Sequence, residues 1–216
     1  VAGLLVLAGC LSQTKPPPPT SRADAPVVRV RLLANVPEVR VGADGSARVV
    51  RFDDLRNPAV VRSNHGAPVS VNDRAYRGMV RLVPTAAGID VVNELTVDEY
   101  LLGVVPREVP ANWASETLRA QAIVARTYAL FEVRSRTGTR HWDLHPDERS
   151  QVYGGVGSED ARTNAAVRET SGLVAVFGPR GQEKIFKAYF SSTCGGGRQS
   201  AGDAWGEAGG PFKPRT

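Results

Sequence analysis

The chain has 216 residues, of which 42% are hydrophobic and 23% charged, so it can bury a sizeable core and is not disordered in composition. Its net charge of +5 comes from arginines scattered along the sequence, which is typical of a solvated surface, although it would also suit an acidic polymer or a membrane surface. Because no zinc-finger, RNA-binding or helix-turn-helix signature is present, we predict no nucleic-acid partner.

The first residues form an apolar run that ends in Leu7-Ala8-Gly9-Cys10. The run is too short to span a bilayer, and it resembles a bacterial lipoprotein signal with its lipobox. We therefore predict that residues 1–10 are a truncated signal peptide with its lipobox and that 11–26 are a proline-rich linker. A lipid on Cys10 would anchor the protein in the bacterial cell envelope and leave Cys194 a free thiol. The alternative is a buried strand, since the run has no initiating Met and no basic segment before it.

After the linker, apolar and charged residues alternate, with Val28 and Val30 on one side of the chain and Arg29 and Arg31 on the other. This period of two predicts a strand, and similar runs recur at 39–41, 69–71, 77–83 and 88–93. The sequence Ala-Asp-Gly at 43–45 predicts a turn after the second strand. We therefore predict a β-rich N-terminal part over residues 27–95.

Two helices are predicted beyond that part. Thr96-Val97-Asp98-Glu99 has the spacing of a capping box, followed by an apolar run. A second helix is predicted from Glu116 to about Arg136, capped by Asn112 or Ser115. The residues of its apolar face are small or aliphatic: Leu118, Ala122, Ala125 and Ala129. The predicted fold is α+β, with a β-rich N-terminal part and a central Ala-rich helix.

The loop predicted between the two helices contains Glu108, which lies between Pro106 and Pro110 and among apolar residues. Such surroundings hold a carboxyl group rigidly and favour its protonated form. On the second helix, Arg126 lies one turn from Ala122, so its guanidinium is expected to be partly buried. Arg126 would contact either a substrate or Glu116, or reach solvent.

Several blocks of this chain resemble the SpoIID/LytB family, named for stage II sporulation protein D. They are YLLGVVPREVPANW at 100–113, ETLRAQAIVARTYAL at 116–130, SQVYGG at 150–155, TNAAVRETSG at 163–172 and AYFSSTCGGGRQSAGDAW at 188–205. The blocks occur in the family's order over roughly residues 77–212. The resemblance identifies 96–216 as a SpoIID-like core and leaves open a further C-terminal piece.

The resemblance implies peptidoglycan as substrate, with sporulation members acting as lytic transglycosylases on peptide-stripped glycan strands. Glu108 occupies the position of the family's catalytic glutamate. One carboxyl group suffices for that reaction, because it first protonates the leaving oxygen and then accepts the proton of the attacking 6-hydroxyl, which yields a 1,6-anhydro-N-acetylmuramic acid end. The other acids of this region are expected to be structural: Glu94, Asp98, Glu99 and Glu116.

The later blocks predict how a saccharide is held. Ser191, Ser192 and Gly196 would offer hydroxyls and exposed backbone amides, unless that stretch is merely a flexible loop. Gln151, Tyr153 and Arg198 are predicted to line the same groove, whereas Trp205 is expected in the core.

No cofactor and no metal are predicted. Some members of the family bind zinc through a His/Cys cluster before the Gln-Val-Tyr block. Here that segment offers only His141 and His145 with acids nearby, which is an incomplete tetrahedral site unless Cys194 joins it.

Two rival functions stay open. LytB-type relatives are thought to bind peptidoglycan and activate an N-acetylmuramoyl-L-alanine amidase without cleaving glycan themselves, so such an amidase is a predicted partner if this chain is of that kind. A purely structural lipoprotein is the third alternative.

Overall fold

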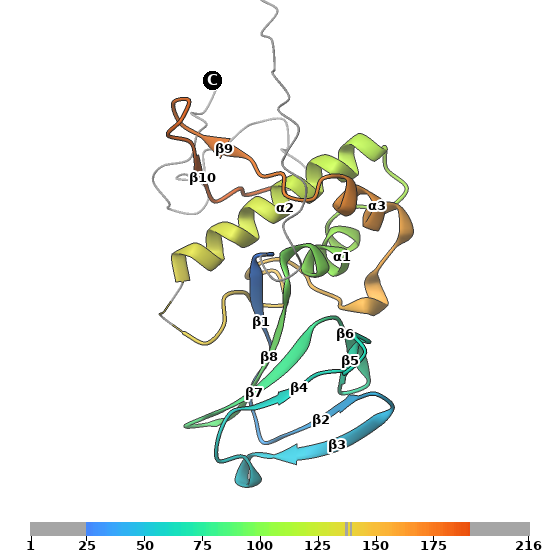
Figure 1. The fold of residues 1–216 in the computed structure, drawn as a ribbon, viewed down its shortest axis with the longest axis vertical. Helices are drawn as coiled ribbons and strands as arrows, with labels where there is room; N and C mark the ends of the chain where they lie inside the picture. The colour runs from blue at the N-terminus through green and yellow to red at the C-terminus, as the bar shows by residue number, and fades with distance from the viewer. Residues whose placement is uncertain (1–24, 137, 139, 191–216) are drawn as a thin grey trace, which may run out of the picture.

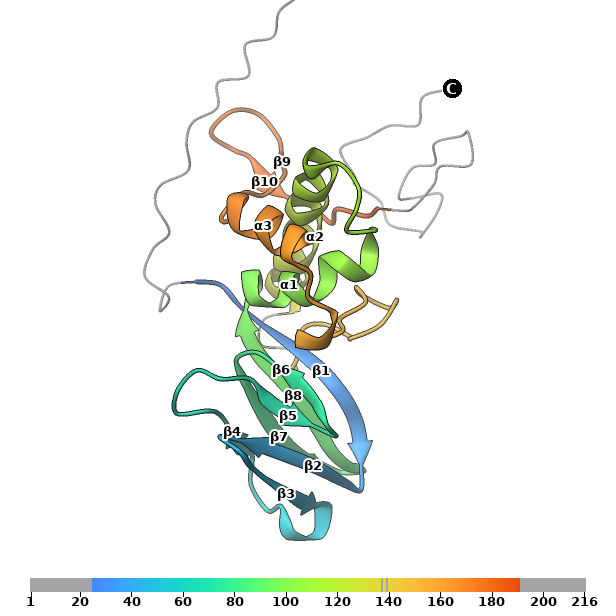
Figure 2. The same cartoon turned by 90° about the vertical axis from the view of Figure 1, so that its right-hand side faces the viewer.

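A computed structural model describes residues 25–190, except 137 and 139, and shows two antiparallel sheets beside a group of helices (Figure 1). Both views place the sheets at one end of the molecule and the three α-helices at the other (Figure 2). This arrangement confirms the predicted α+β class and its β-rich N-terminal part. No helix of the described ranges is long and apolar enough to cross a membrane.

The first sheet has the order β1-β8-β7-β4, formed by β1 (Val27–Val36), β8 (Gly88–Thr96), β7 (Met79–Thr85) and β4 (Ala59–Val61). The second has the order β3-β2-β5-β6, formed by β3 (Ser46–Arg51), β2 (Glu38–Ala43), β5 (Val69–Val71) and β6 (Arg74–Tyr76). A short 3-10 helix, η2 (Phe52–Asp54), follows β3.

In β1 and β2 the apolar residues face the core and the arginines between them face outward, as the alternation predicts. Val28 and Val30 of β1 are fully buried, and Val39 and Val41 of β2 join the same core, while the arginines between them stay accessible. The predicted turn after β2 is a two-residue hairpin loop with φ 50° at Asp44 and 81° at Gly45. Positive φ at both positions is the geometry of a hairpin turn that matches the twist of its strands.

Strand β8 is the centre of the first sheet, and it continues directly into the first helix. Every residue of β8 except Thr96 is buried, so its polar side chains need internal partners. Asn93 donates hydrogen bonds to the carbonyl oxygens of Arg77 and Met79, and Glu94 pairs with Arg81 at 2.6 Å. These bonds fix the strand from which the helical part begins.

Three α-helices follow, α1 (Val97–Glu108), α2 (Ser115–Arg136) and α3 (Ala161–Glu169), with η3 (Val156–Ser158) before α3. The capping box at the start of α1 is confirmed, since Thr96 and Glu99 exchange side-chain and backbone hydrogen bonds. The long Ala-rich helix is confirmed too, but its predicted cap is wrong. Ala114, whose carbonyl accepts from the amides of Thr117 and Leu118, precedes the helix.

The alanines of α2 explain how closely the helices pack. Ala122, Ala125 and Ala129 are fully buried, and α2 contacts both α1 and α3 along this face. Small side chains allow the backbones of neighbouring helices to approach. A short hairpin of β9 (Val176–Phe177) and β10 (Lys184–Ile185) follows α3 and lies beside α2 in Figure 1.

The segment between α2 and α3 is tied to the first sheet. Asp143 is 1% exposed, accepts from the backbone amide of Arg29 at 2.9 Å and forms an ion pair with the same residue's guanidinium at 2.6 Å. Leu144 forms a parallel bridge with Val30 of β1. These contacts fix the start of the loop that next reaches the end of α1.

Candidate functional site

Glu108 is the last residue of α1 rather than part of a free loop. The loop was predicted from Pro106 and Pro110, but Pro106 lies inside the final turn of the helix, where it removes a single backbone bond. A carboxylate at a helix C-terminus lies near the negative end of the helix dipole, which is electrostatically unfavourable. Helix stability therefore gives no reason for this acid to be there.

The carboxyl group of Glu108 is held by the loop that follows Leu144. It is half-buried, and its Oε1 accepts a hydrogen bond of 2.9 Å from the backbone amide of Val152. The same loop binds α1 about one and a half turns earlier, where the amide of Gly154 donates to the carbonyl of Gly103 at 3.0 Å. Two hydrogen bonds thus fix the acid against a segment more than forty residues further along the chain.

A cleft of about 430 Å³ opens beside this carboxyl group. Its walls come from the end of α1, the middle of α2, the loop before Val152 and the segment after β10. The lining residues are Glu108, Tyr128, Glu148, Arg149, Ser150, Val152, Lys187, Tyr189 and Phe190.

Aromatic rings form one wall of the cleft. The rings of Tyr128 and Tyr189 meet edge to face with centroids 6.2 Å apart. Burial raises the pKa of the Tyr128 phenol, so it remains a hydrogen-bond donor throughout the neutral range. Flat rings beside a half-buried acid suit the apolar face of a sugar ring.

Lys187 joins this wall to α2. Its Nζ lies 4.9 Å from the centroid of the Tyr189 ring and 3.3 Å from Oε1 of Glu132, which is 2% exposed. Glu132 also pairs with Arg136 of the same helix at 2.6 Å, so Lys187 is its second cationic partner and the one that ties the segment after β10 to α2.

The site lies largely within a segment that known proteins share. Residues 85–177 match the family described as Stage II sporulation protein, SpoIID. Residues 85–177 of the chain are a SpoIID domain, and relatives named for stage II sporulation protein D and for amidase enhancement support the SpoIID/LytB family. Three cleft residues, Lys187, Tyr189 and Phe190, lie beyond the matched SpoIID segment.

Three relatives show how far the likeness extends. An uncharacterised protein of Brachyspira hyodysenteriae is 33% identical over 139 residues, which cover 64% of this chain and 37% of that protein. The amidase enhancer of Bacillus subtilis is 38% identical over 106 residues, covering 49% and 13% respectively. Stage II sporulation protein D of Bacillus amyloliquefaciens is 31% identical over 132 residues, covering 54% and 37%. This chain therefore spans little more than a third of the length of the Brachyspira protein and of stage II sporulation protein D. No solved structure matches it.

Arg126 is buried rather than available to a substrate. It is 1% exposed, and its Nε donates to Asp98 at 2.8 Å. Its two terminal nitrogens donate to the carbonyls of Leu173 and Val167, both at 3.1 Å. The predicted substrate contact is replaced by a structural one, because α3 and the chain after it cover the guanidinium.

Gln151 and Tyr153, which were predicted in the sugar groove, are core residues as well. Gln151 is 1% exposed and lies between the Tyr100 hydroxyl and the carbonyl of Ala125. Tyr153 is 6% exposed and donates to Asn93 of β8 at 2.9 Å. Their role is to anchor the loop that presents the Val152 amide to Glu108.

The four acids that were expected to be structural each have a partner within the protein. Glu94 pairs with Arg81, Asp98 with Arg126 and Glu116 with Arg119, while Glu99 completes the capping box. The acid that the sequence analysis did not single out is Glu148, which lines the cleft with Glu108. Tyr128, Ser150 and Lys187 were missed in the same way, although Tyr128 and Ser150 lie within family blocks.

The two histidines before the Gln-Val-Tyr block are used separately. His141 Nε2 lies 2.8 Å from a carboxylate oxygen of Asp90, whereas the His145 ring packs on Trp142 with centroids 4.6 Å apart. Burial lowers the pKa of His145. In the described part of the chain, no group of three or more His, Cys, Asp or Glu side chains could hold a metal ion.

The remaining predicted site residues lie outside the described residues: Cys10, Ser191, Ser192, Cys194, Gly196, Arg198 and Trp205.

Proposed function

We propose that this protein is a lytic transglycosylase that cleaves peptidoglycan glycan strands, with Glu108 as its acid and base. The observation that carries the proposal is the position of Glu108. It is a half-buried carboxyl group, oriented by the Val152 amide, at the edge of a cleft with an aromatic wall. It also occupies the family's catalytic position. The cleft volume of about 430 Å³ is typical of small-ligand sites.

The proposed reaction begins with the protonated carboxyl group of Glu108, which donates its proton to the glycosidic oxygen as the bond from that oxygen to the anomeric carbon of N-acetylmuramic acid breaks. The carboxylate then takes the proton of the 6-hydroxyl of the same sugar, whose oxygen bonds to the anomeric carbon. The products are two shorter strands, one beginning with a free 4-hydroxyl and the other ending in 1,6-anhydro-N-acetylmuramic acid. No water is consumed, and Glu108 regains its proton.

The other cleft residues have supporting roles in this proposal. Tyr189 would pack against a sugar ring with Tyr128, which is 6% exposed, behind it, and Ser150 would hydrogen-bond one of the sugar hydroxyls. An ordinary glycoside hydrolase requires a second carboxyl group to act as nucleophile or to activate water. Glu148 is the acid in the cleft that would serve in that case.

A second candidate function has specific support. The amidase enhancer of Bacillus subtilis is 38% identical to this chain over 106 residues. The alternative proposal is that the cleft binds glycan without cleaving it and that the protein activates an N-acetylmuramoyl-L-alanine amidase.

Product analysis on peptide-stripped glycan tests both proposals. Purified protein is incubated with the strands, and the soluble fragments are analysed by mass spectrometry. New 1,6-anhydro ends support transglycosylation, whereas reducing ends carrying a solvent oxygen from ¹⁸O-labelled water would show hydrolysis instead. Binding of the strands without new ends, together with faster peptide release by an added amidase, would favour the activator.

We further propose that a lipid on Cys10 places the protein in the bacterial cell envelope. The support is the lipobox-like sequence alone. Expression of the full precursor with Cys10→Ser should move the protein from the membrane fraction to the soluble fraction. A variant that stays in the membrane fraction would contradict the anchor.

A further inference from the structure

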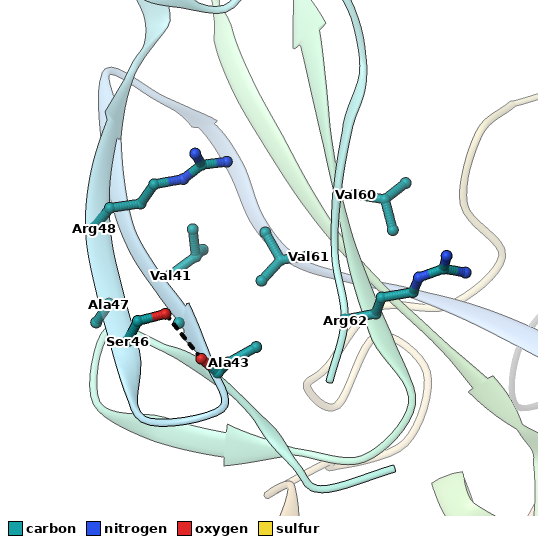
Figure 3. Close-up of a pocket in the computed structure, with 9 residues that line it drawn as sticks. Val41, Ala43, Ser46, Ala47, Arg48, Val60, Val61 and Arg62 are labelled. Carbon is teal, nitrogen blue, oxygen red and sulfur yellow. Dashed lines mark hydrogen bonds between the residues drawn. The ribbon is translucent and has the colours of Figure 1, made fainter. Parts of the chain in front are cut away.

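A second hollow lies in the β-rich part, far along the chain from Glu108. It has a volume of about 360 Å³ and opens between the β2–β3 hairpin and strand β4 (Figure 3). Figure 3 shows the side chains of Val41 and Val61 facing one another across this groove, with the guanidinium of Arg48 above Val41. The groove is therefore apolar at Val41 and Val61, and two arginines line it: Arg48, and Arg62, whose side chain points away from Val61 in Figure 3.

The direction of Arg48 follows from the register of the hairpin. Arg48 pairs with Val41, and Val50 with Val39, so these four side chains lie on the same face of the sheet. Val39 and Val41 are core residues, which makes this the inner face. Within residues 25–190, leaving 137 and 139 aside, no carboxylate pairs with Arg48. Its charge is thus available to an incoming anion.

Both strands beside the groove are sheet edges. β4 ends the first sheet and β3 ends the second, and within the described part of the chain neither has a strand on its outer side. An edge strand presents backbone amides and carbonyls to which another extended chain can bind. The exposed Val60 of β4 adds apolar surface at this edge.

One end of the groove is closed by the hairpin turn. Asp44 accepts hydrogen bonds from the Ser63 hydroxyl and the Asn64 amide, which ties the turn to the chain after β4. These hydrogen bonds lower the pKa of Asp44, and its carboxylate faces the loop at 63–64. These two hydrogen bonds hold the hairpin turn beside the chain that follows β4.

We propose that this groove binds the carboxyl-terminal end of a partner protein as an added strand. The terminal residues would hydrogen-bond to the free edge of β4, pack a small apolar side chain on the half-buried Val61 above the buried Val41, and set the terminal carboxylate against Arg48. Strand addition and capture of a chain terminus are known modes of peptide recognition. Arg48 lies on β3, across the groove from the β4 edge, so a strand that adds to β4 and ends there would meet its positive charge with a carboxylate.

The test uses a short acetylated L-peptide that ends in Ala-Val-Ala with a free carboxylate, together with its C-terminal amide. Binding to the whole protein is followed by amide chemical shifts in NMR titrations. The free acid should shift resonances of β2, β3 and β4, and the amide should bind about tenfold more weakly, because a charge-assisted bond is lost. Equal binding of acid and amide would overturn the proposal, as would shifts confined to the Glu108 cleft.

Arg48→Gln and Arg51→Gln form a matched pair of variants. Both remove one positive charge from β3, but Arg51 lies on the outer face, where it pairs with Glu38 at 3.4 Å. Arg48→Gln should abolish the preference for the free acid, and Arg51→Gln should retain it. A preference that survives Arg48→Gln would contradict the role of Arg48.

The third titration uses a peptide that ends in D-Ala, as the stem peptides of the cell wall do, and compares its binding with that of the L-peptide. D-residues do not match the pairing geometry of an L-strand edge, so acetylated Lys-D-Ala-D-Ala should bind more weakly than the L-peptide. Tighter binding of the D-peptide would replace the protein partner with the cell wall. None of these titrations contains glycan, so their outcome is independent of whether Glu108 cleaves it.

Discussion

The backbone amide of Val152 donates a 2.9 Å hydrogen bond to Oε1 of Glu108, which joins the proposed acid to a loop rather than to its own helix. That loop is in turn packed on α1 through Tyr153, whose ring contacts Gly103. A Cβ on Gly103 would lie 2.7 Å from the Tyr153 ring. The position of the acid therefore depends on the absence of a side chain one turn and a half earlier in the same helix.

Gly103→Ala is predicted to separate the loop from α1. The new methyl group cannot be accommodated unless Tyr153 moves, so the free energy of unfolding should fall by about 1–3 kcal/mol. Glycan cleavage should fall further than stability alone explains, because the Val152 amide moves with Tyr153. Urea unfolding and the fragment assay would be run on the same preparations. Gly157→Ala is the control, since a Cβ there meets nothing within 4 Å. Unchanged activity in a destabilised Gly103→Ala variant would show that the loop does not position Glu108.

Arg126→Ala is predicted to act on stability rather than on substrate binding. The change leaves Asp98 and the carbonyls of Val167 and Leu173 without their donor. Removing one member of a buried ion pair costs about 3–5 kcal/mol, and the partial exposure of Asp98 places the expected loss at the lower end.

Arg119→Ala provides the comparison for Arg126. It breaks accessible pairs with Glu116 and Glu169, and such pairs contribute about 0–1 kcal/mol. Chemical denaturation measures both variants, and glycan binding is measured at a temperature where both are folded. If Arg126→Ala is as stable as wild type but has lost glycan binding, the substrate role first predicted for Arg126 would be correct after all.

The parts of the fold that were predictable depend on local patterns. The alternation of apolar and charged residues predicted β1 and β2, and the capping box predicted the start of α1. Both are predictable because a strand face and a helix cap are each defined within a few residues. The burial of Arg126 and Tyr153 was not predictable in that way. Their partners, Leu173 and Asn93, lie 47 and 60 positions away, and a polar residue looks the same whether it meets a ligand or a distant backbone group.

The same limit explains the errors at the site. Two prolines around Glu108 indicated a loop, yet α1 contains Pro106 and ends only two residues later, so the lost backbone hydrogen bond falls at the end of the helix. Lys187 was not predicted because its partner Glu132 is 55 positions away, on the buried side of α2. Glu108 itself was found through the family resemblance and its apolar neighbours, both of which are features of the adjacent sequence.

The ion pair between Asp147 and Arg149 in the cleft loop is predicted to persist well into acid. The Arg149 guanidinium, by its hydrogen bonds, lowers the pKa of Asp147 to about 2. A depressed carboxyl pKa means that this contribution is fully present above the unfolded value, near 3.9, and is lost as pH falls toward 2. NMR titration of the Asp147 carboxyl carbon should give a midpoint near 2. Arg149→Gln should move it up toward about 3.9, whereas a midpoint unmoved by that change would mean that the ion pair does not form in solution.

Zinc content is predicted to be well below one equivalent per chain. His141 is engaged with Asp90 and His145 is packed on Trp142, so the two rings do not form a shared site among the described residues. Elemental analysis measures the content, and a chelator should leave the melting temperature unchanged. Stoichiometric zinc, or a melting temperature lowered by the chelator, would show that the histidines converge with a ligand from another part of the chain.

Glu108→Gln is predicted to remove catalysis while leaving the fold and glycan binding intact. The amide has nearly the same shape, and its oxygen still accepts from the Val152 amide, so the loop should stay in place. An amide can neither donate the proton that the leaving oxygen needs nor accept one from the 6-hydroxyl. The rate of anhydro-end release should therefore fall about a hundredfold to ten-thousandfold. Glu116→Gln, which changes an exposed acid on α2, should release fragments at the wild-type rate.

Glu148→Gln decides the mechanism: a transglycosylase that uses one acid should keep most of its activity, whereas a two-carboxylate hydrolase should lose it. Full turnover in Glu108→Gln would refute the assignment, because no other group lining the cleft holds the position of the family's acid.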